Sequence, residues 1–304
     1  MSPINASGIS LIKKGYGMMQ EAMYYHSREN GVTACELCPR GCVIKPGDKG
    51  FCRVRENRDG VLYALNYGKY TALALDPIEK KPLFHFFPGS RILSVGTFGC
   101  SFHCGFCQNW QIAHQAIEGE NVSPGTIVFW ALEAVKKGSV GVAYTYSEPL
   151  MWYEFVLDTA RKVQEAGLKN VLVTNGFIRP EPFSRLLPFI DALNIDVKGF
   201  TGEFYRKIVK GEFKPVLAAA ESAYHAGKHL EITTLLIPGL NDSKEEVEKL
   251  VSWISESLGP EVPLHFSRYF PNYRMDLAPT PIRTLQAAQD IALKKLNYVY
   301  LGNV

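Results

Sequence analysis

The stretch GCSFHCGFCQN at residues 99–109 places Cys100, Cys104 and Cys107 in one short loop with a CxxxCxxC spacing. Cubane iron–sulfur clusters are normally held by four cysteine thiolates. Three thiolates from one loop would leave one iron free to bind a further ligand. The preceding residues, 91–98, are largely apolar and predict a core strand. The loop is therefore predicted to leave the end of a strand and to hold a cluster with one open position.

A structural zinc site is the alternative for the same loop. Zinc sites usually close with a fourth Cys or His, and His103 and His114 are near in sequence. Counting ligands does not exclude zinc. The preceding strand and the aromatic Phe106 directly before Cys107 favour the iron–sulfur cluster.

These features together resemble the signature of the radical S-adenosylmethionine (SAM) superfamily, which is CxxxCx(aromatic)C after the first barrel strand. The resemblance implies a [4Fe-4S] cluster on Cys100, Cys104 and Cys107, with SAM bound to the open iron. It also implies a partial barrel with its reactive groups at the carboxyl ends of the strands.

The composition is that of an ordinary globular protein. The chain has 304 residues, 21% charged and 46% hydrophobic, which allows one large domain or a domain with an appendage. The net charge of +3 and the lack of a Lys/Arg run give no clear sign of a nucleic-acid partner. Residues 1–23 lack the apolar core of a signal peptide, and no apolar stretch reaches the length of a membrane span. We expect a cytoplasmic protein with no membrane partner, in which cysteines bind metal rather than form disulfides.

Strand and helix patterns alternate after the cysteine loop. Apolar strand patterns occur at residues 140–146, 170–174, 192–198, 229–237 and 262–269. Helices are predicted between them, one starting at Ser123 and another at Ser243, each with an N-cap pattern. The first helix carries an apolar stripe at helical spacing, formed by Ile127, Ala131, Leu132 and Val135. Repeated βα units predict an α/β fold with a parallel sheet, and six such strands predict a partial TIM-type (β/α)6 barrel of the radical SAM type.

The second predicted strand is followed by Glu148 and Pro149, preceded by Tyr146 and Ser147. Radical SAM enzymes carry a GGE-type element here that holds the amino group and carboxylate of SAM. The resemblance therefore assigns a SAM contact to Glu148, although Tyr146 and Ser147 replace the two glycines. The alternative is a helix start, where a glutamate is favourable in the first turn.

Asn194, Asp196 and Lys198 share one face of their predicted strand because side chains alternate with a period of two. Polar groups lining a buried interior are costly unless they pair or bind something. The family resemblance implies that Asp196 and Lys198 contact SAM. A structural salt bridge between them is the alternative, and the pair could serve in both ways.

Two further residues are carried over from the family. Asn175, in the turn after the third strand, corresponds to a position near the SAM ribose, although Asn-Gly is also a strong turn former. His265 corresponds to a histidine on the last strand near SAM. A satisfied core histidine is the alternative for His265.

Four more cysteines, Cys35, Cys38, Cys42 and Cys52, lie within eighteen residues, with glycines and a proline between them. Four thiolates form a closed set that suits tetrahedral zinc or a fully ligated second iron–sulfur cluster. We predict a small metal-stabilised N-terminal module at residues 1–88 and a radical SAM core at residues 89–304.

The CxxCPRxC pattern ahead of such a barrel resembles the radical SAM branch of the AmmeMemoRadiSam system, whose members are often described as homologues of the pyruvate formate-lyase activating enzyme. The resemblance implies reductive cleavage of SAM to methionine and a 5'-deoxyadenosyl radical, which abstracts hydrogen from a substrate. The partners implied are a flavodoxin- or ferredoxin-like electron donor and an unidentified substrate, either a protein, as for the glycyl-radical activases, or another molecule. The alternative function is a non-catalytic iron–sulfur- or zinc-binding interaction module.

Overall fold

A computed structural model describes residues 19–115 and 117–304 of the chain. The expectation about a signal peptide concerns residues that lie mostly outside this part. Among the residues described, no helix combines the length and the apolar character that crossing a bilayer requires.

An eight-stranded sheet forms the centre of the molecule, in the order β16-β15-β14-β13-β12-β11-β9-β8. Every neighbouring pair from β9 to β16 is parallel, and β8 is antiparallel to β9. The strands are β8 (Ala72–Pro77), β9 (Arg91–Gly96), β11 (Ser139–Tyr144), β12 (Lys169–Thr174), β13 (Ala192–Asp196), β14 (His229–Leu236), β15 (Leu264–Arg268) and β16 (Val299–Gly302).

The sheet confirms the predicted α/β class. All six predicted strands are present, and their ends differ from the apolar patterns by at most two residues. The two outer strands, β8 and β16, do not pair with each other, so the sheet is open, as a partial barrel requires. Neither outer strand was predicted.

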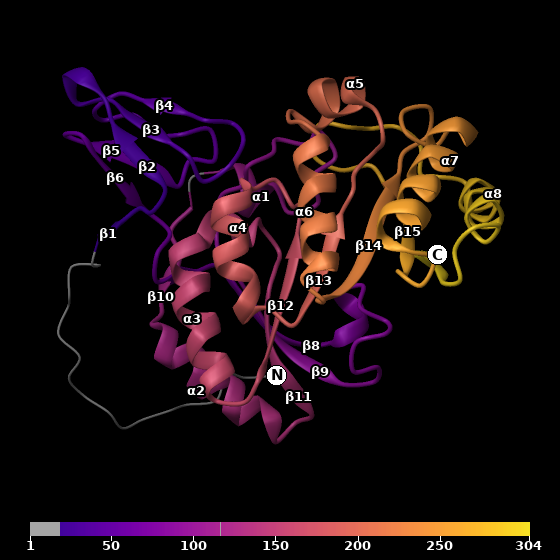
Figure 1. Cartoon of the computed structure of the whole chain (residues 1–304), viewed down its shortest axis with the longest axis horizontal. Coiled ribbons are helices and arrows are strands. Elements are labelled where there is room, and N and C mark those ends of the chain that lie inside the picture. The colour runs from indigo at the N-terminus through magenta and orange to yellow at the C-terminus, as the bar shows by residue number, and fades with distance from the viewer. Residues whose placement is uncertain (1–18, 116) are drawn as a thin grey trace.

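Helices connect the parallel strands and, as Figure 1 shows, pack along one side of the sheet. Short strands linked in parallel need such crossovers, which cover the apolar face of the sheet. The longer helices are α2 (Pro124–Val135), α3 (Tyr153–Glu165), α4 (Pro180–Leu186), α6 (Lys214–His225), α7 (Lys244–Trp253) and α8 (Ile282–Ala292). The two predicted N-caps are confirmed, because Ser123 Oγ accepts from the Thr126 N–H at 3.0 Å and Ser243 Oγ from the Glu246 N–H at 3.2 Å.

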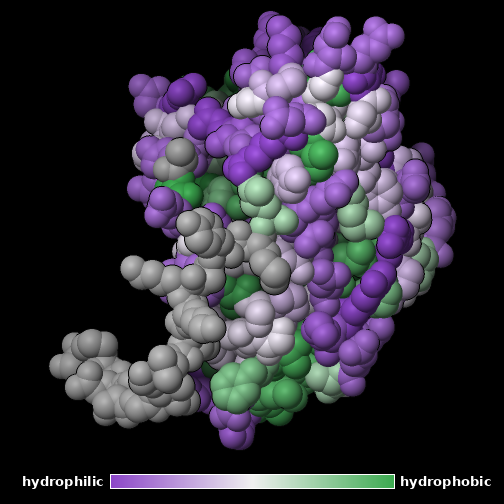
Figure 2. Space-filling model, turned by 90° about the vertical axis from the view of Figure 1, so that its left-hand side faces the viewer, coloured by the Kyte–Doolittle hydropathy of each residue, from purple (hydrophilic) through white to green (hydrophobic). Residues whose placement is uncertain are grey.

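The apolar stripe predicted for α2 is only partly buried. Ile127 and Ala131 are inside, whereas Leu132 and Val135 are 46% and 44% exposed, beside Phe129 at 61%. Figure 2, which looks at the side of the molecule where α2 lies, shows apolar residues low on that side. The sequence pattern therefore includes apolar residues of α2 that do not pack against the rest of the protein.

The N-terminal region forms small antiparallel sheets beside one end of the central sheet (Figure 1). One has the order β1-β6-β5, another β2-β3-β4, and β7 pairs with β10. Their strands are β1 (Gln20–Glu21), β2 (Tyr25–Ser27), β3 (Thr33–Cys35), β4 (Val43–Ile44), β5 (Arg55–Arg58), β6 (Val61–Ala64), β7 (Lys69–Tyr70) and β10 (Glu120–Asn121). The shorter helices include α1 (Trp110–His114), α5 (Gly202–Phe204), which continues into a π-helical turn η5 (Tyr205–Val209), and a 3-10 turn η3 (Pro149–Trp152). The others are η1 (Glu29–Gly31), η2 (Ile78–Lys80), η4 (Leu187–Phe189) and the π-helical turn η6 (Ile254–Leu258).

This region shares its apolar interior with the central sheet. Cys35, Leu37 and Val54 belong to the same cluster of buried residues as Val95 and Tyr144 of the sheet. β8, although it precedes residue 88, is an edge strand of the central sheet. Residues 19–88 therefore contribute to both parts of the structure.

Candidate cofactor site

A cavity of about 400 Å³ opens at the carboxyl ends of the central strands. It is lined by the three cysteines of the loop at residues 99–109, which we call the cluster loop. Four of the five other residues that the sequence assigns to SAM binding also line it. These seven residues are Cys100, Cys104, Cys107, Glu148, Asn175, Asp196 and Lys198. The topology therefore brings together side chains that are up to 98 positions apart in the chain, counting from Cys100 to Lys198.

The cluster loop is fixed by close backbone packing. Gly99 has a φ of +91°, and a Cβ there would lie 2.5 Å from Val54 Cγ1 and 2.8 Å from the Cys52 carbonyl oxygen. Only glycine allows this approach. Further along the loop, the N–H groups of His103 and Gly105 donate to the carbonyls of Val209 and Ile208 in η5, both at 3.2 Å. The loop is thus held on both sides before any ligand binds.

The three thiols share an environment that favours their neutral form. Burial, the nearby Glu148 carboxylate and the neighbouring cysteines hold the pKa of Cys100 well above its usual range. Burial raises the pKa of Cys104 to about 12, against a lowering influence from Lys198. Burial also raises the pKa of Cys107. A bound cationic metal centre would offset the cost of ionising them, so the donor set fits an iron–sulfur cluster.

Glu148 links the ends of two neighbouring strands. Its carboxylate accepts hydrogen bonds from the Leu150 N–H (3.0 Å), the Thr174 hydroxyl (2.5 Å) and the Asn175 N–H (2.8 Å). The side chain is 2% exposed, and burial raises its pKa to about 7 despite these bonds. Glu148 is also the N-cap of η3, which is the helix start given as the alternative for this residue. The same side chain lines the cavity.

Tyr146, two residues before Glu148, has an unusual backbone conformation. Tyr146, which stands where the family pattern has a glycine, has a φ of +72°, a left-handed conformation that costs a non-glycine residue of the order of 1 kcal/mol. Its hydroxyl donates to Asp76 Oδ2 at 2.8 Å, and Lys81 Nζ lies 4.8 Å from the ring centre. The chain therefore keeps the glycine-like conformation at this position with a tyrosine.

Sequence reasoning missed Asp76 and Lys81. Both come from the segment around β8, and they form an ion pair at 2.8 Å. Lys81 is 3% exposed and lines the cavity. A single Lys-Lys-Pro at 80–82 has no periodic pattern that would have indicated a buried lysine.

Asn175 touches the cluster loop directly. Its Nδ2 donates to Ser101 Oγ at 3.1 Å and lies 3.6 Å from Cys100 Sγ. Its Oδ1 accepts from the Phe177 N–H at 2.9 Å, as expected for a turn-forming asparagine. Both interpretations of Asn175 are thus compatible with its surroundings.

Asp196 and Lys198 form the salt bridge that is the structural alternative for this pair, with Lys198 Nζ and Asp196 Oδ2 3.2 Å apart. Burial lowers the pKa of Lys198, but the charges of Asp196 and Cys104 outweigh it and raise that pKa. Asn194, predicted to share their face, also lines the cavity. Asp196 and Lys198 therefore balance each other's charge and also line the cavity.

His265 lies away from the cavity. It is the second residue of β15, near the end of the strand opposite the cavity, and its Nε2 is 2.6 Å from Glu231 Oε2. Glu231 also accepts hydrogen bonds from the N–H groups of Phe84 and His85 and contacts His229. On the same strand it is Ser267 that lines the cavity. The alternative of a satisfied core histidine describes this geometry.

The four N-terminal cysteines line one small enclosed cavity together with Arg55 and Ser101. Burial and the neighbouring thiols raise the pKa of Cys38 to about 12, and burial raises that of Cys52 to about 11. Arg55, 1% exposed, has a buried Nε without a hydrogen-bond partner among the described residues. The charge of Arg55 is already balanced by an ion pair with Glu154, so the argument for a metal rests on the four thiols that share one cavity. Four thiols in this arrangement fit a four-thiolate metal centre.

Neither cysteine group is preformed around a single ion. Within residues 19–115 and 117–304, no three His, Cys, Asp or Glu side chains are arranged to hold one metal ion. What the structure shows for each group is that its thiols line one common cavity.

Comparisons with known proteins concern the family and the fold of the chain. The family model described as the radical SAM superfamily matches residues 94–254. An uncharacterized protein of Methanocaldococcus jannaschii is 44% identical over 291 residues, which cover 94% of this chain and 86% of that protein. A pyruvate formate-lyase-activating enzyme of Clostridium pasteurianum is 27% identical over 174 residues, which cover 55% of this chain and 70% of that enzyme.

The crystal structure of a radical SAM methyltransferase from Sphaerobacter thermophilus matches 71% of this chain and 67% of its own, with a TM-score of 0.56 and 17% identity. At this identity the likeness concerns the fold alone.

Proposed function

Because this chain belongs to the radical SAM superfamily, we propose that it is an enzyme that cleaves SAM reductively and uses the resulting radical to abstract hydrogen from a substrate. One observation carries the proposal: three cysteine thiols from one loop line the same cavity as Glu148, Asn175, Asp196 and Lys198. A site that had lost turnover would not need both the thiols and a polar wall opposite them.

Cys100, Cys104 and Cys107 would hold a [4Fe-4S] cluster. When bound, the cluster supplies one electron and an open iron for SAM, whose C–S bond is cleaved to give methionine and a 5'-deoxyadenosyl radical. The chain itself supplies orientation and exclusion of water, as is general for proteins that use such cofactors. Phe102 and Phe106, both buried, are apolar parts of this cavity wall.

The polar wall would position SAM. SAM carries an ammonium and a carboxylate, and the cavity offers partners of both charges in Glu148 and in the Asp196–Lys198 pair. Asn175, beside Cys100, would contact the ribose or orient the loop. Each of these residues is proposed to bind and orient SAM, and none to act as an acid or base.

The relatives suggest a class of substrate for this chain. The pyruvate formate-lyase-activating enzyme, by its name, acts on another enzyme, and it aligns over 55% of this chain. We therefore propose an activase-like reaction on a partner protein as the first class to test. The electron would come from a flavodoxin- or ferredoxin-like donor.

The four N-terminal cysteines would hold either zinc or a second iron–sulfur cluster. Both fit four thiolates beside Arg55. Metal analysis of a Cys100→Ala/Cys104→Ala/Cys107→Ala variant separates these cases, because only the N-terminal group remains. Zinc without iron supports a structural site, and iron with sulfide supports a second cluster.

Anaerobic reconstitution with iron and sulfide, followed by dithionite and SAM, tests the proposed function. We expect 5'-deoxyadenosine from the wild-type protein and none from the Cys104→Ala variant, which should keep metal at the four-cysteine group. A fully assembled cluster that yields no 5'-deoxyadenosine would instead support the non-catalytic metal-binding module. Loss of both metal signals in Cys104→Ala would show that the two sites are not independent.

A further inference from the structure

A groove of about 750 Å³ lies on the surface beside both cysteine groups. One wall comes from the N-terminal region and includes Arg40 and Phe51. The other comes from the segment that follows β13 and includes Arg206, Lys210 and Lys214. The groove shares no lining residue with the cofactor cavity.

The charge of the groove is strongly unbalanced. Its lining holds four basic side chains, Arg40, Arg206, Lys210 and Lys214, against one carboxylate, Glu212. Arg206, Lys210 and Lys214 are exposed. Throughout the described residues, none of the four cations forms an ion pair with a carboxylate. Unpaired surface cations attract an oppositely charged partner and steer its approach.

The first wall touches both cysteine groups. Arg40 stands between Cys38 and Cys42 in sequence, and its guanidinium lies 3.5 Å from the ring centre of Phe51, the residue before Cys52. The same guanidinium donates to the Ser101 carbonyl at 3.0 Å, next to Cys100, and also to the Lys210 carbonyl. Arg40 therefore bridges the four-cysteine group, the cluster loop and the opposite wall.

The second wall holds the cluster loop through its backbone. Lys210 directly follows η5, whose Val209 carbonyl accepts from the His103 N–H and lies 3.9 Å from Cys104 Sγ. A Cβ at Gly211 would lie 2.2 Å from the Phe102 ring, so this segment packs directly on the loop. A molecule bound in the groove would be separated from the loop by one layer of protein.

We propose that this groove is the docking site of a small acidic electron-carrier protein, through which the electron for the reaction enters. The inference rests on the proposed function, which consumes one electron for each SAM cleaved. That electron leaves the reduced carrier, which is left oxidised by one electron, and it breaks the sulfonium C–S bond into methionine and the 5'-deoxyadenosyl radical. The cavity at the strand ends is thereby left open for SAM and substrate.

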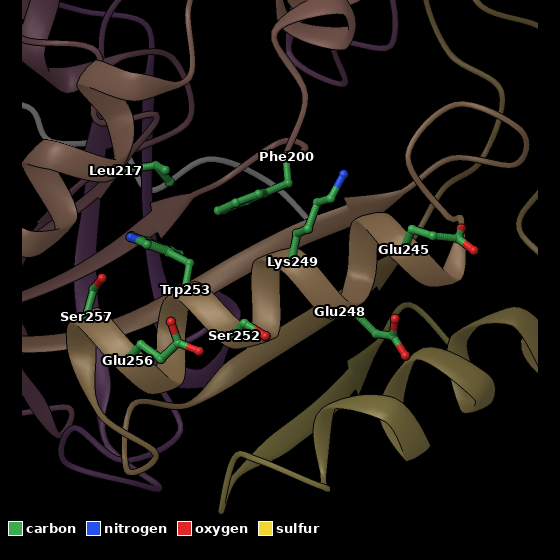
Figure 3. A pocket seen from close by; sticks show the side chains of 9 residues that line it. All are labelled: Phe200, Leu217, Glu245, Glu248, Lys249, Ser252, Trp253, Glu256 and Ser257. Carbon is green, nitrogen blue, oxygen red and sulfur yellow. The ribbon is translucent and has the colours of Figure 1, made fainter.

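A second surface groove, of about 640 Å³, does not suit such a partner. Figure 3 shows Phe200 and Trp253 on this surface, with the carboxylates of Glu245, Glu248 and Glu256 along α7 and the turn after it. Lys249 is the single basic residue among its lining residues. An acidic carrier would be repelled there, whereas the charge of the basic groove is complementary to such a partner.

The test reverses charge on the groove rim with an Arg206→Glu/Lys214→Glu variant. Neither side chain is engaged in a hydrogen bond among the residues described. Lys137→Glu/Lys294→Glu is the matched control, because it changes net charge equally at exposed lysines outside the groove. Reduced flavodoxin and a reduced acidic ferredoxin serve as probes, and dithionite serves as the small reductant that needs no docking.

We expect carrier-driven 5'-deoxyadenosine formation and carrier affinity to fall about tenfold or more in the groove variant, and neither to change in the control. The wild-type affinity should weaken between about 50 and about 200 mM salt. The dithionite-driven rate should be unchanged in both variants.

The proposal would be overturned by equal loss in the control, by an unchanged carrier-driven rate in the groove variant, or by no binding of either carrier to the wild-type protein. A loss of the dithionite-driven rate in the groove variant would also overturn it, since the residues would then support the loop. If dithionite yields no 5'-deoxyadenosine from the wild type, the proposed function fails, while carrier binding still tests the groove by itself.

Discussion

At the scale of single residues, Glu148 has the most concentrated set of contacts in the cavity. Three donors from two strand ends converge on its carboxylate. Glu148→Ala would leave two buried N–H groups and the Thr174 hydroxyl without this acceptor, so we expect the free energy of unfolding to fall by on the order of 3 kcal/mol. Urea denaturation measures this. Glu165→Ala, an exposed glutamate on α3, is the control and should change nothing. An unaltered midpoint for Glu148→Ala would contradict the structural part of its role.

Lys198 offers a test of SAM positioning. In Lys198→Met the aliphatic stem stays and the charge is lost, which leaves Asp196 without its 3.2 Å partner. We expect SAM affinity to fall about tenfold, the loss typical of one charged hydrogen bond, with iron content unchanged. Equilibrium binding of SAM to the reconstituted protein measures the effect.

The matched control is Lys169→Met, which breaks a similar pair with Asp191 at the start of β12, away from the cavity. Equal weakening in both variants would indicate a general loss of stability. Unchanged affinity in Lys198→Met would remove Lys198 from the proposed SAM contacts.

Residue positions could be predicted from sequence where the signal is local. The cysteine spacing and the period-two face of residues 194, 196 and 198 are local, and these residues all line the cavity. His265 was misplaced because the apolar pattern at 262–269 does not show where the strand begins. β15 starts at Leu264, which puts His265 near the wrong end. The left-handed backbone of Tyr146 was not predicted, and its side chain contacts Asp76 and Lys81 from a segment distant in sequence.

At the scale of elements, Glu231 ties β14 to the segment before β9. Burial alone would raise its pKa, but hydrogen bonds from His229, His265 and the N–H groups of His85 and Phe84 outweigh burial and lower it to about 2. A carboxyl whose pKa is lower in the folded state stabilises the fold above its unfolded pKa of about 4.3, and that contribution is lost as the pH falls toward about 2.

We therefore expect the wild type to lose on the order of 3 kcal/mol from this group between about pH 5 and about pH 2. Urea midpoints across this range should fall more steeply for the wild type than for Glu231→Gln, so that the gap between them narrows. The exposed Glu256→Gln should run parallel to the wild type throughout. A constant gap between wild type and Glu231→Gln would contradict the assignment.

The elements missed from sequence are those defined by long-range pairing. β16 has four residues, and β8 lies in a stretch that was assigned to the N-terminal module. Neither has a pattern strong enough to identify an edge strand without its neighbour. The six central strands were found because each is an apolar segment, and the helices starting at Ser123 and Ser243 carry clear N-cap patterns between them.

At the scale of the whole molecule, one buried ion pair fastens the N-terminal region to the barrel. Arg55 of β5 and Glu154 of α3 form two hydrogen bonds of 2.8 and 3.0 Å, with side chains 1% and 4% exposed. Glu154→Gln would leave a buried guanidinium without its counter-charge, and we expect a loss of about 3–5 kcal/mol.

Denaturation followed by far-ultraviolet circular dichroism should show a single transition for both proteins, because the two regions share one apolar interior. Glu133→Gln, in an exposed pair with Lys136, should cost about 0.5 kcal/mol or less. Two separate transitions in Glu154→Gln would show that the N-terminal region unfolds by itself.

With the proposed cluster on Cys100, the contact between Asn175 and Cys100 would have an electrochemical consequence. Hydrogen bonds to the sulfurs of an iron–sulfur cluster are among the factors that set its reduction potential. Asn175 directs its amide toward Cys100 Sγ while its backbone N–H is held by Glu148. A ligand that draws on the Glu148 carboxylate would thus also adjust the amide beside the thiolate. Occupancy of the cavity and the readiness of the cluster to accept an electron would then be linked through a single side chain.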